Sequence, residues 1–351
     1  MVKQTPQQNC PKLYLAPMAG LTDRPFRELC RHYGCLAGTF VPMIGATALL
    51  NKSSRQHTLA LLDWKDDPQD RQVQIFGSSA LELYQASRIL VDLGASGLNL
   101  NMGCQMAKVT KNGAGAALLR DLELAKYAIS ACVKAANSQI PVSIKLRLGW
   151  DRFNTAELLG QLQNLGVSQV FMHARLASDK FSGPVRLVEL KAAAQASSVP
   201  FYANGNIVDY HSASQMAALP NCRGLMIGRA ALGRPAIFAQ LAAHFKQHIQ
   251  GGGQEARDDL FRLAKLEATE ALPQTEVLRQ KIEAIQKHIA LAEQYTEADE
   301  LSAVRRLRRH WIAYNCLPPE IMSATTFAQL KSLVAAVAQP LPTKADGAGL
   351  N

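Results

Sequence analysis

The sequence lacks any run of about 20 apolar residues, the length that a helix needs to cross a lipid bilayer. Its first residues, MVKQTPQQNCPK, also lack the apolar core of a signal peptide. We therefore expect a cytoplasmic protein without a membrane partner.

Cysteine and histidine are scarce and dispersed. The seven cysteines are odd in number and no two are spaced as CxxC, which argues against a disulfide framework and against a zinc site. The eight histidines include no HExxH pair, which would place two metal ligands on one helix face. We therefore predict that no metal is bound.

Acidic residues are outnumbered by basic ones. The 38 Lys and Arg against 28 Asp and Glu give a formal net charge of +10, which predicts a polyanionic partner. Hydrophobic residues make up 48% and charged residues 19%, a globular composition that excludes a mainly disordered chain. The length of 351 residues suits one large domain with a smaller one, or two domains of middling size.

Eight short apolar segments, most of them followed by a helical pattern, occupy the chain up to residue 228. Strands that alternate with helices predict a parallel sheet. Eight such units favour a (β/α)₈ TIM barrel over a doubly wound open sheet, which more often has about five or six strands. The expected strands are Leu13–Met18, Gly38–Met43, Gln72–Gly77, Gly97–Gly103, Pro141–Leu148, Gln169–Arg175, Pro200–Gly205 and Gly224–Gly228.

Beyond Phe238 only helical periodicity is present, and the glycines at 251–253 mark a boundary. The fold class is therefore α/β, with a barrel followed by a smaller all-helical C-terminal domain. We predict a catalytic barrel over residues 1–245, a helical domain over 254–338 and a flexible tail over 339–351. The apolar positions that predict the helices are Ile282, Ile285, Ile289 and Ala292, then Val304, Leu307 and Trp311.

Polar and glycine-containing segments end most of the expected strands. In a barrel of this kind the carboxyl ends of the strands build the active site, and packing alone does not explain seven such segments. They are Pro17-Met18-Ala19-Gly20, Gln74, Asn101-Met102-Gly103-Cys104, Lys145 with Arg147, His173 with Arg175, Asn204-Gly205-Asn206, and Gly228-Arg229.

The turns after strands seven and eight predict a phosphate site. Gly205 and Gly228 would expose backbone N–H groups, a following helix start would add a favourable dipole, and Arg229 would add a charge-assisted bond. The alternative is that these glycines only permit tight turns. Lys145 favours the phosphate interpretation, because it would point a cation into the barrel mouth, where it could stabilise a reduced flavin-like ring.

Cys104 and His173 can each be interpreted as a functional or as a structural residue. A lone cysteine is usually a small buried apolar residue, but Cys104 falls in a loop at the barrel mouth. A lone histidine is often bonded to the backbone, but His173 lies two residues before Arg175 at a strand end. Both positions favour contact with a cofactor or substrate.

Eight ordered motifs span nearly the whole chain and carry a family resemblance. They are LAPMAGLTDRPFR (15–27), VQIFGS (73–78), NLNMGC (99–104), GAGAALL (113–119), SIKLRLGW (143–150), HAR (173–175), ANGNI (203–207) and LMIGRAALGRPAIF (225–238). In this order they resemble the flavin-dependent tRNA-dihydrouridine synthases.

The resemblance implies an FMN-binding barrel followed by a helical tRNA-binding domain. It implies that NADPH reduces FMN, that the flavin delivers hydride to C6 of a uridine in the tRNA D-loop, and that Cys104 protonates C5. The cofactor contacts that it implies are Pro17, Met18, Ala19, Gln74, Lys145, His173, Asn204, Gly205, Asn206, Gly228 and Arg229.

The sequence departs from the family pattern at three places. Gln105 follows the cysteine where the family usually has proline, and Ala174 and Leu176 alter the usual HGRT motif. The segment 41–44 lacks the expected glutamate. We interpret these differences as marks of a divergent branch that retains the chemistry.

The run VRRLRRHW at 304–311 predicts a helix that is apolar on one side and basic on the other. Such runs are often only solvated, but four arginines without interleaved acids favour phosphate contact. Lys281, Lys287 and His288 would extend this basic track. The predicted substrate contacts are Asn101, Arg147, Arg175, Lys108, Lys111, Arg305, Arg308 and Arg309.

Two alternatives stay open at this stage. One is an FMN-dependent dehydrogenase of free pyrimidines, which would explain the barrel but not the basic helix. The other is a non-catalytic tRNA-binding protein on the same scaffold. We expect the protein to be a monomer.

Overall fold

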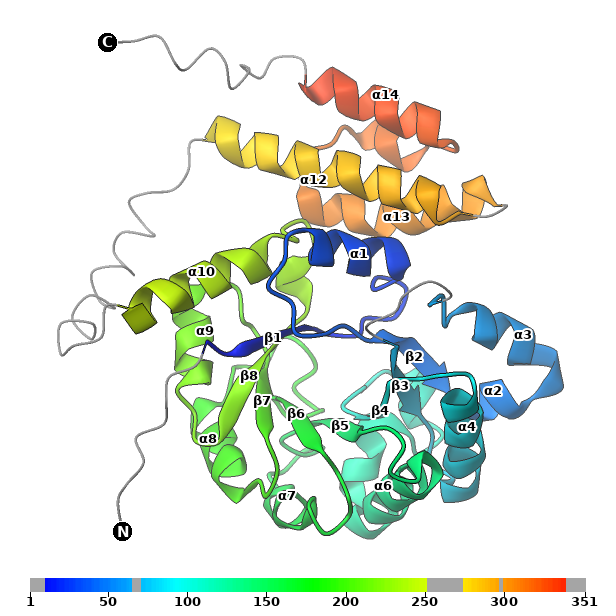
Figure 1. Cartoon of the computed structure of the whole chain (residues 1–351), viewed down its shortest axis with the longest axis vertical. Helices are drawn as coiled ribbons and strands as arrows, with labels where there is room; N and C mark the ends of the chain where they lie inside the picture. Colours follow the sequence, from blue (N-terminus) through cyan, green and yellow to red (C-terminus); the bar gives the residue numbers. More distant parts are fainter. Residues whose placement is uncertain (1–9, 65–70, 251–273, 297–298, 339–351) are drawn as a thin grey trace.

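Eight parallel strands form one sheet in the order β1-β8-β7-β6-β5-β4-β3-β2 (Figure 1). The computed structural model describes residues 10–64, 71–250, 274–296 and 299–338. The strands are β1 Lys12–Leu15, β2 Val41–Gly45, β3 Gln72–Phe76, β4 Gly97–Met102, β5 Val142–Arg147, β6 Gln169–His173, β7 Phe201–Asn204 and β8 Cys222–Ile227. Each expected strand overlaps one of these, so the predicted barrel is confirmed.

The two edges of the sheet meet just before β2. Leu15 N donates to the Gly38 carbonyl at 3.1 Å, and Ala37 N donates to the Leu13 carbonyl at 2.7 Å. Tyr14 and Gly38 form a parallel bridge. These bonds connect β1 to the segment that enters β2 and close the sheet into a (β/α)₈ barrel.

Strands β1 and β6 end at least two residues earlier than the sequence suggested. β1 stops at Leu15, and Pro17, which has no N–H to donate to a ladder, follows closely. β6 stops at His173, whose carbonyl accepts from Arg175 N at 2.8 Å in a tight turn. Met18 and Arg175 therefore lie on loops beyond the strand ends.

An aromatic cluster fills part of the barrel interior. The rings of Phe171 and Tyr202 stack at 4.8 Å, and Tyr14 meets each of them edge-on at 5.2 Å. Ala16, Phe40 and Met226 complete this buried group. The interior is thus packed with side chains, as expected for a barrel of eight strands.

Helices and short 3₁₀ turns connect and surround the strands. Asp23 caps the first helix by accepting a hydrogen bond from Phe26 N. The elements are α1 Arg24–His32, α2 Ala46–Leu50, α3 Lys52–Ala60, α4 Ala80–Asp92, α5 Ala107–Thr110, η1 Gly115–Arg120, α6 Leu122–Ala136, α7 Ala156–Gln161, α8 Leu187–Ala196, α9 Tyr210–Ala217, η2 Arg229–Ala231 and α10 Ile237–Gln250.

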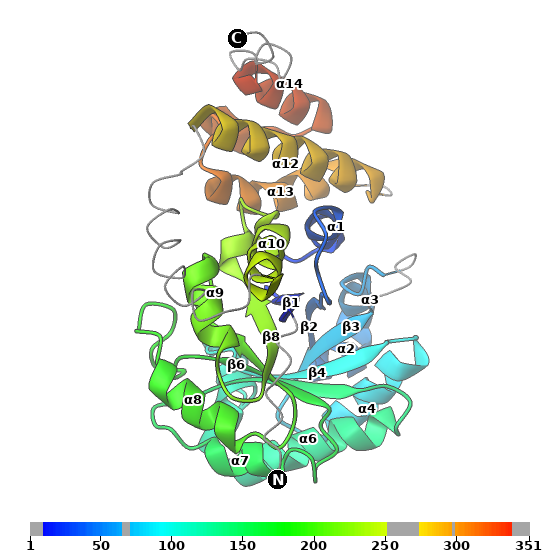
Figure 2. The ribbon, with the colours of Figure 1, turned by 60° about the vertical axis from the view of Figure 1, so that its left-hand side comes forward.

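The C-terminal region is helical and has its own apolar core. Its elements are α12 Gln274–Gln294, α13 Glu300–Tyr314, η3 Pro319–Met322 and α14 Phe327–Ala338. The apolar positions that predicted the helices are all buried, and they pack into a cluster separate from the barrel core. Figure 2 shows these helices stacked beyond α1 and α10.

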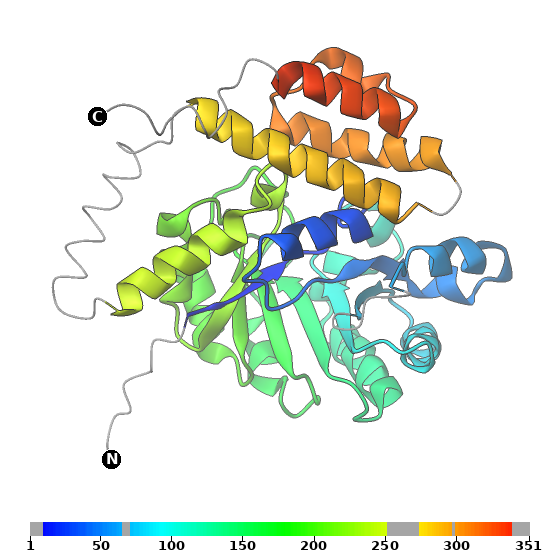
Figure 3. The same ribbon diagram turned by 45° about the horizontal axis from the view of Figure 1, so that its top comes forward.

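The helical region rests on the barrel mainly through α1, as the views in Figures 1 and 3 agree. The guanidinium carbon of Arg24 lies 3.9 Å from the centroid of the Tyr295 ring. After β8, Gly233 packs so closely on α13 that a Cβ there would clash with the Ala313 carbonyl. The two parts therefore share a close, specific interface.

The predicted domain division stays a proposal. Its first boundary, residue 245, lies inside α10, whereas residues 251–254 and the tail 339–351 lie outside the described residues. Within the described part of the chain, no helix is both long enough and apolar enough to span a membrane.

Candidate active site

Strand ends β4 to β7 bring the predicted polar residues together. In the sheet register Asn101 is the partner of Lys145, Arg147 is the partner of His173, and His173 is the partner of Asn204. All of them stand at or near the carboxyl ends of their strands. The structure thus gathers these residues at the barrel mouth, as the sequence predicted.

Asn101 fixes the start of the loop that carries Cys104. Its Oδ1 accepts from the backbone N–H groups of Gly103 at 3.0 Å and Cys104 at 2.9 Å. Its Nδ2 donates to Gln74 Oε1 at 2.8 Å. Asn101 therefore positions the backbone of Cys104, a role that the sequence did not reveal.

The bond between Asn101 and Gln74 belongs to a longer buried chain. Gln74 Nε2 donates to Asn99 Oδ1 at 2.6 Å, and Asn99 Nδ2 donates to Ser143 Oγ at 2.8 Å. Gln74 is 1% exposed and already serves two protein partners. Its predicted contact with a cofactor would depend on its remaining N–H.

Gly115 lets the chain fold back over Cys104. Its φ of +62° lies in the left-handed region, and Ala116 N donates to the Cys104 carbonyl at 2.9 Å. A Cβ at this position would lie 2.7 Å from that carbonyl oxygen and 2.8 Å from Val109 Cγ1. Only glycine fits here without displacing the Cys104 loop.

Arg147 joins the loop of Cys104 to the loop after β6. Its Nε donates to the Gly103 carbonyl at 2.9 Å, and its Nη1 donates to the carbonyls of Leu176 and Lys180, each at 2.8 Å. Arg147 is 2% exposed and most of its N–H groups are used. It braces the site, and one N–H of its Nη2 remains for a substrate.

Lys145 is a cation with no partner in the described part of the chain. Its ammonium group makes no hydrogen bond or ion pair with the residues that the structure describes. Burial first, and then the charge of Arg147, lower its pKa to about 8, and the nearby Cys104 opposes the decrease. Such a group is available to a bound anion or an electron-rich ring.

His173 and Arg175 each have a polar atom that no described residue binds. Nδ1 of His173 and Nη1 of Arg175 are buried and have no hydrogen-bond partner among the described residues. Burial lowers the pKa of His173 well below its ordinary value, and surrounding cations, Lys145 first, add to the decrease. The ring is therefore neutral. Orphaned atoms of this kind mark a place where a ligand completes the site.

The turns after β7 and β8 are tight but differ from the predicted phosphate site in one respect. Gly205 has a φ of +120°, and Asn204 Nδ2 donates to the Met226 carbonyl at 2.6 Å. The following helix, α9, is capped by its own Asp209, whose Oδ1 accepts from Ser212 N at 2.7 Å. The start of α9 is therefore occupied by a carboxylate. Exposed Asn206 and Arg229, with half-buried Gly228, remain open to a ligand.

The loop after β1 lies beside Gly228. Thr22 holds this loop by accepting from Met18 N at 3.0 Å, so the Met18 N–H is already used. A Cβ at Gly228 would come within 3.7 Å of Met18 Sδ. Half-buried Pro17 and Met18 and exposed Ala19 therefore reach the mouth near β8.

Phe181 is a site residue that the sequence reasoning missed. It is 49% exposed, and its ring centroid lies 5.4 Å from the guanidinium carbon of Arg147 and 5.1 Å from that of Arg229. Its loop is braced by the ion pair of Arg186 with Asp179 at 3.1 Å. The sequence shows a phenylalanine in the loop after β6. Its position beside the two strand-end arginines, however, follows only from the path of that loop.

The predicted basic surface is present in part. Arg305, Arg309, Lys108 and Lys111 are exposed. Arg308 is half-buried and donates from Nη2 to the Ala324 carbonyl at 2.8 Å, which turns it toward its own domain.

Arg309 and His288 differ in how they relate to the predicted basic surface. Arg309 donates from Nη1 to the Gly20 carbonyl at 3.4 Å, which brings the basic helix to the loop after β1. The prediction that His288 lies on the surface was wrong, because it is fully buried.

Comparisons with known proteins identify the family. A family model described as "Dihydrouridine synthase (Dus)" matches residues 14–343. The tRNA-dihydrouridine synthase B of Pseudomonas aeruginosa is 39% identical over 233 residues, which are 66% of this chain and 68% of that protein. The protein of the same name from Yersinia pestis is 38% identical over 236 residues, 66% of this chain and 71% of that protein. The chain belongs to the dihydrouridine synthase family.

Family membership confirms the resemblance seen in the motifs and makes this protein a flavin-dependent oxidoreductase. Among solved structures, histamine dehydrogenase from Rhizobium sp. 4-9 matches 68% of this chain and 46% of its own, with a TM-score of 0.51 and 10% identity. This likeness supports the barrel fold alone.

Proposed function

We propose that the protein is a tRNA-dihydrouridine synthase that reduces the C5–C6 double bond of specific D-loop uridines to 5,6-dihydrouridine. The proposal includes FMN as the flavin, NADPH as the reductant, Cys104 as the proton donor to C5, and a cytoplasmic monomer. Relatives of 38–39% identity bear the name tRNA-dihydrouridine synthase B. The observation that carries it is a cysteine held at the barrel mouth beside Lys145, whose ammonium group has no partner among the described residues.

The site suits a cysteine acid. Hydride addition at C6 of a pyrimidine builds enolate-like negative charge. An acid near C5 must neutralise this charge by protonation as it forms. The Cys104 thiol would give its proton to C5 and later regain one from solvent. Lys145 and Arg147 lie close enough to Cys104 for the sulfur to affect the pKa of each. Both cations would stabilise the thiolate that remains after proton transfer.

The mouth also suits a flavin mononucleotide. When bound, this cofactor supplies the hydride that is added to the pyrimidine. The unpartnered Lys145 ammonium, Nδ1 of His173 and Nη1 of Arg175 offer polar contacts for the ring, the phosphate or the substrate. The residues proposed to hold the cofactor are Pro17, Met18, Ala19, Gln74, Lys145, His173, Asn204, Gly205, Asn206, Gly228 and Arg229.

We propose that tRNA binds across both parts of the chain, with 1–245 as the catalytic domain and 254–338 as the RNA-binding domain. The contact of Arg309 with Gly20 places the basic helix next to the β1 loop. Phosphate contacts would orient the RNA without reading its sequence. They would also offset the few kcal/mol that unstacking the target base costs. The proposed substrate contacts are Asn101, Arg147, Arg175, Lys108, Lys111, Arg305, Arg308 and Arg309.

Mass-spectrometric mapping of tRNA from cells with and without the gene tests this function. We expect dihydrouridine to disappear from specific D-loop positions in the deletion strain. It should reappear when that tRNA is incubated with the purified yellow protein and NADPH. Unchanged dihydrouridine in the deletion strain, together with no product in vitro, would refute the proposal.

A further inference from the structure

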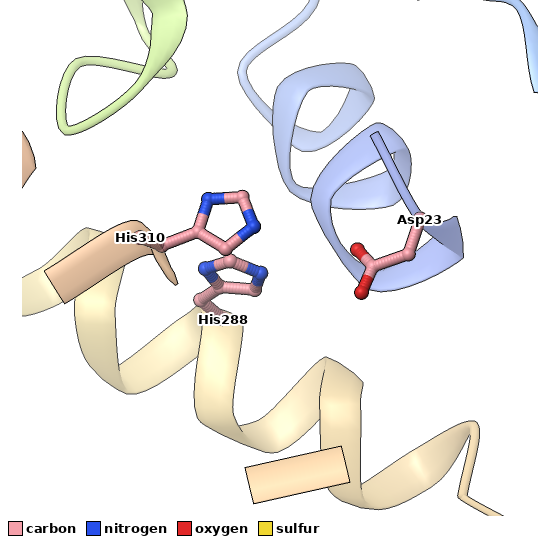
Figure 4. Close-up of side chains that lie close together, drawn as sticks. All are labelled: Asp23, His288 and His310. Atoms are coloured by element: carbon pink, nitrogen blue, oxygen red, sulfur yellow. The ribbon is translucent and has the colours of Figure 1, made fainter. Parts of the chain in front are cut away.

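Asp23, His288 and His310 meet where the helical region rests on the barrel (Figure 4). They come from the cap of α1, from α12 and from α13. Their carboxylate and ring-nitrogen ligand atoms lie within 4.8 Å of one another. In Figure 4 each imidazole turns one nitrogen toward the Asp23 carboxylate. Three elements that are distant in sequence thus converge on one point.

The ring nitrogens of the two buried histidines form no hydrogen bonds within the described ranges. Both are 0% exposed, and none of their four ring nitrogens has a partner among the residues that the structure describes. The backbone of Leu21 lies near enough to His310 to act on its pKa, but it does not meet hydrogen-bond geometry. Buried polar atoms in native proteins are normally paired, so four orphans at one place call for a ligand.

The charge states of Asp23, His288 and His310 suit the binding of a cation. Burial lowers the pKa of His288 well below its ordinary value and that of His310 to about 4, so both rings are neutral and offer lone pairs. Burial raises the pKa of Asp23 to about 6, which leaves its carboxylate largely ionised at pH 7. Oδ1 of Asp23 accepts from Phe26 N at 3.3 Å, and Oδ2 accepts from no described residue.

Aromatic packing alone does not account for these side chains. The ring centroid of His310 lies 4.7 Å from that of Phe26 and 4.7 Å from that of His288. Phenylalanine would give the same ring contacts without burying unpaired nitrogens. Two neutral imidazoles and a carboxylate are instead the ligand types that Zn²⁺ prefers.

We propose that Asp23, His288 and His310 bind one divalent transition-metal ion, best suited to Zn²⁺, that fastens the helical region to the barrel. Zinc ligands lie about 2.0–2.2 Å from the ion, so small side-chain rotations bring the three donors together. A water molecule would complete the coordination. The sequence predicted no metal because these ligands lie on separate elements and follow no motif spacing.

The ion would also orient the basic helix toward the active site. Asp23 shares its loop with Gly20, whose carbonyl accepts from Arg309 of the same helix as His310. The site lies outside the set of residues proposed for catalysis. Its test therefore succeeds or fails independently of the enzymatic activity.

The test is a titration of the full chain after metal has been removed with a chelator. We expect calorimetry to show one Zn²⁺ bound per chain, Co²⁺ to give visible absorption bands, and Zn²⁺ to raise the melting temperature. Asp23→Asn retains a helix cap, and His288→Phe and His310→Phe retain ring packing. Each substitution removes one of the three protein ligands and should weaken Zn²⁺ binding by at least about 100-fold, the upper end of the cost of losing an outer-shell partner. The exposed His211 on α9 gives a matched control, His211→Ala, which should bind as the wild type does.

Two results would overturn the site. One is the absence of stoichiometric Zn²⁺ or Co²⁺ binding by the wild-type chain. The other is wild-type Zn²⁺ affinity in the folded phenylalanine variants, which would leave the histidines as packing residues. If one phenylalanine variant does not fold, the wild-type titration and Asp23→Asn still decide the matter.

Discussion

Arg147 donates from Nη2 to the side-chain Oε1 of Gln105 at 3.0 Å. Gln105 follows the proposed acid Cys104 at the position where the motif resemblance implies a proline. In this protein a hydrogen bond to a buried guanidinium therefore takes over the restraint that a proline ring would impose. Because Arg147 also binds the Gly103 carbonyl, it holds the chain on both sides of Cys104.

Replacing Gln105 tests that restraint. Gln105→Ala should slow uridine reduction by up to about tenfold, since a charge-assisted hydrogen bond contributes about 1.5 kcal/mol. Flavin binding should not change. Single-turnover rates on unmodified tRNA measure the effect, with Met106→Ala as the control because Met106 is 59% exposed. Equal rates in both variants would show that the Gln105 side chain does not position the loop.

Gly115 offers a second test of the same loop. Gly115→Ala should lower the free energy of unfolding by more than about 1 kcal/mol, because φ is positive and the new Cβ would press on the Cys104 carbonyl. Gly160→Ala in α7 is the matched control, since the nearest atom to its new Cβ lies 3.8 Å away. That change should leave stability unchanged or raise it by up to about 1 kcal/mol. Urea unfolding compares the two, and an equal shift in both would contradict the account.

The lowered pKa of Lys145 predicts that the folding stability of the flavin-free protein depends on pH. Its pKa is about 8 in the fold against 10.5 as the ordinary value, so between these pH values the unfolded chain holds the extra proton. Stability should therefore rise with pH across this window. Lys145→Met removes the cost of a buried cation, so its advantage over the wild type should be largest near pH 7 and shrink toward pH 10. Thermal melts at several pH values measure this, and a constant difference would exclude Lys145 as the titrating group.

The basic helix predicts a salt-dependent affinity for tRNA. Arg305→Gln should weaken binding and lower the slope of log K against log salt by about 0.7–0.9, the effect of one lost phosphate contact. Arg223→Gln is the control, because Arg223 is exposed near the start of β8, at the opposite end of the barrel. Filter binding between low and moderate salt measures both. An unchanged slope for Arg305→Gln would make the helix a solvated face only.

The sequence predicted the positions of the strand-end residues well, because a parallel barrel places all strand ends at one mouth. Asn101, Lys145 and His173 therefore gathered as expected. The bond between Arg147 and Gln105 and the position of Phe181 depend on loop paths, which no periodicity specifies.

In the helical region, the burial of His288 could have been predicted from the sequence. His288 lies three residues after Ile285 and one before Ile289, on the face that packs inward, so helical spacing alone indicates burial. Arg308 follows buried Leu307 at the edge of the apolar face, close enough to reach the Ala324 carbonyl. The convergence of His288 with Asp23 and His310 could not be predicted, because it depends on how α12 and α13 dock on α1.

The most direct test of the proposed chemistry is dihydrouridine formation by Cys104→Ala, measured by mass spectrometry on tRNA incubated with NADPH. A general acid typically contributes about 10²- to 10⁴-fold, so product formation should fall by at least about 100-fold while flavin and tRNA binding persist. Cys316→Ala, at a cysteine of similar exposure in the helical region, should retain full activity. Full activity in Cys104→Ala would contradict the assignment of Cys104 as the proton donor.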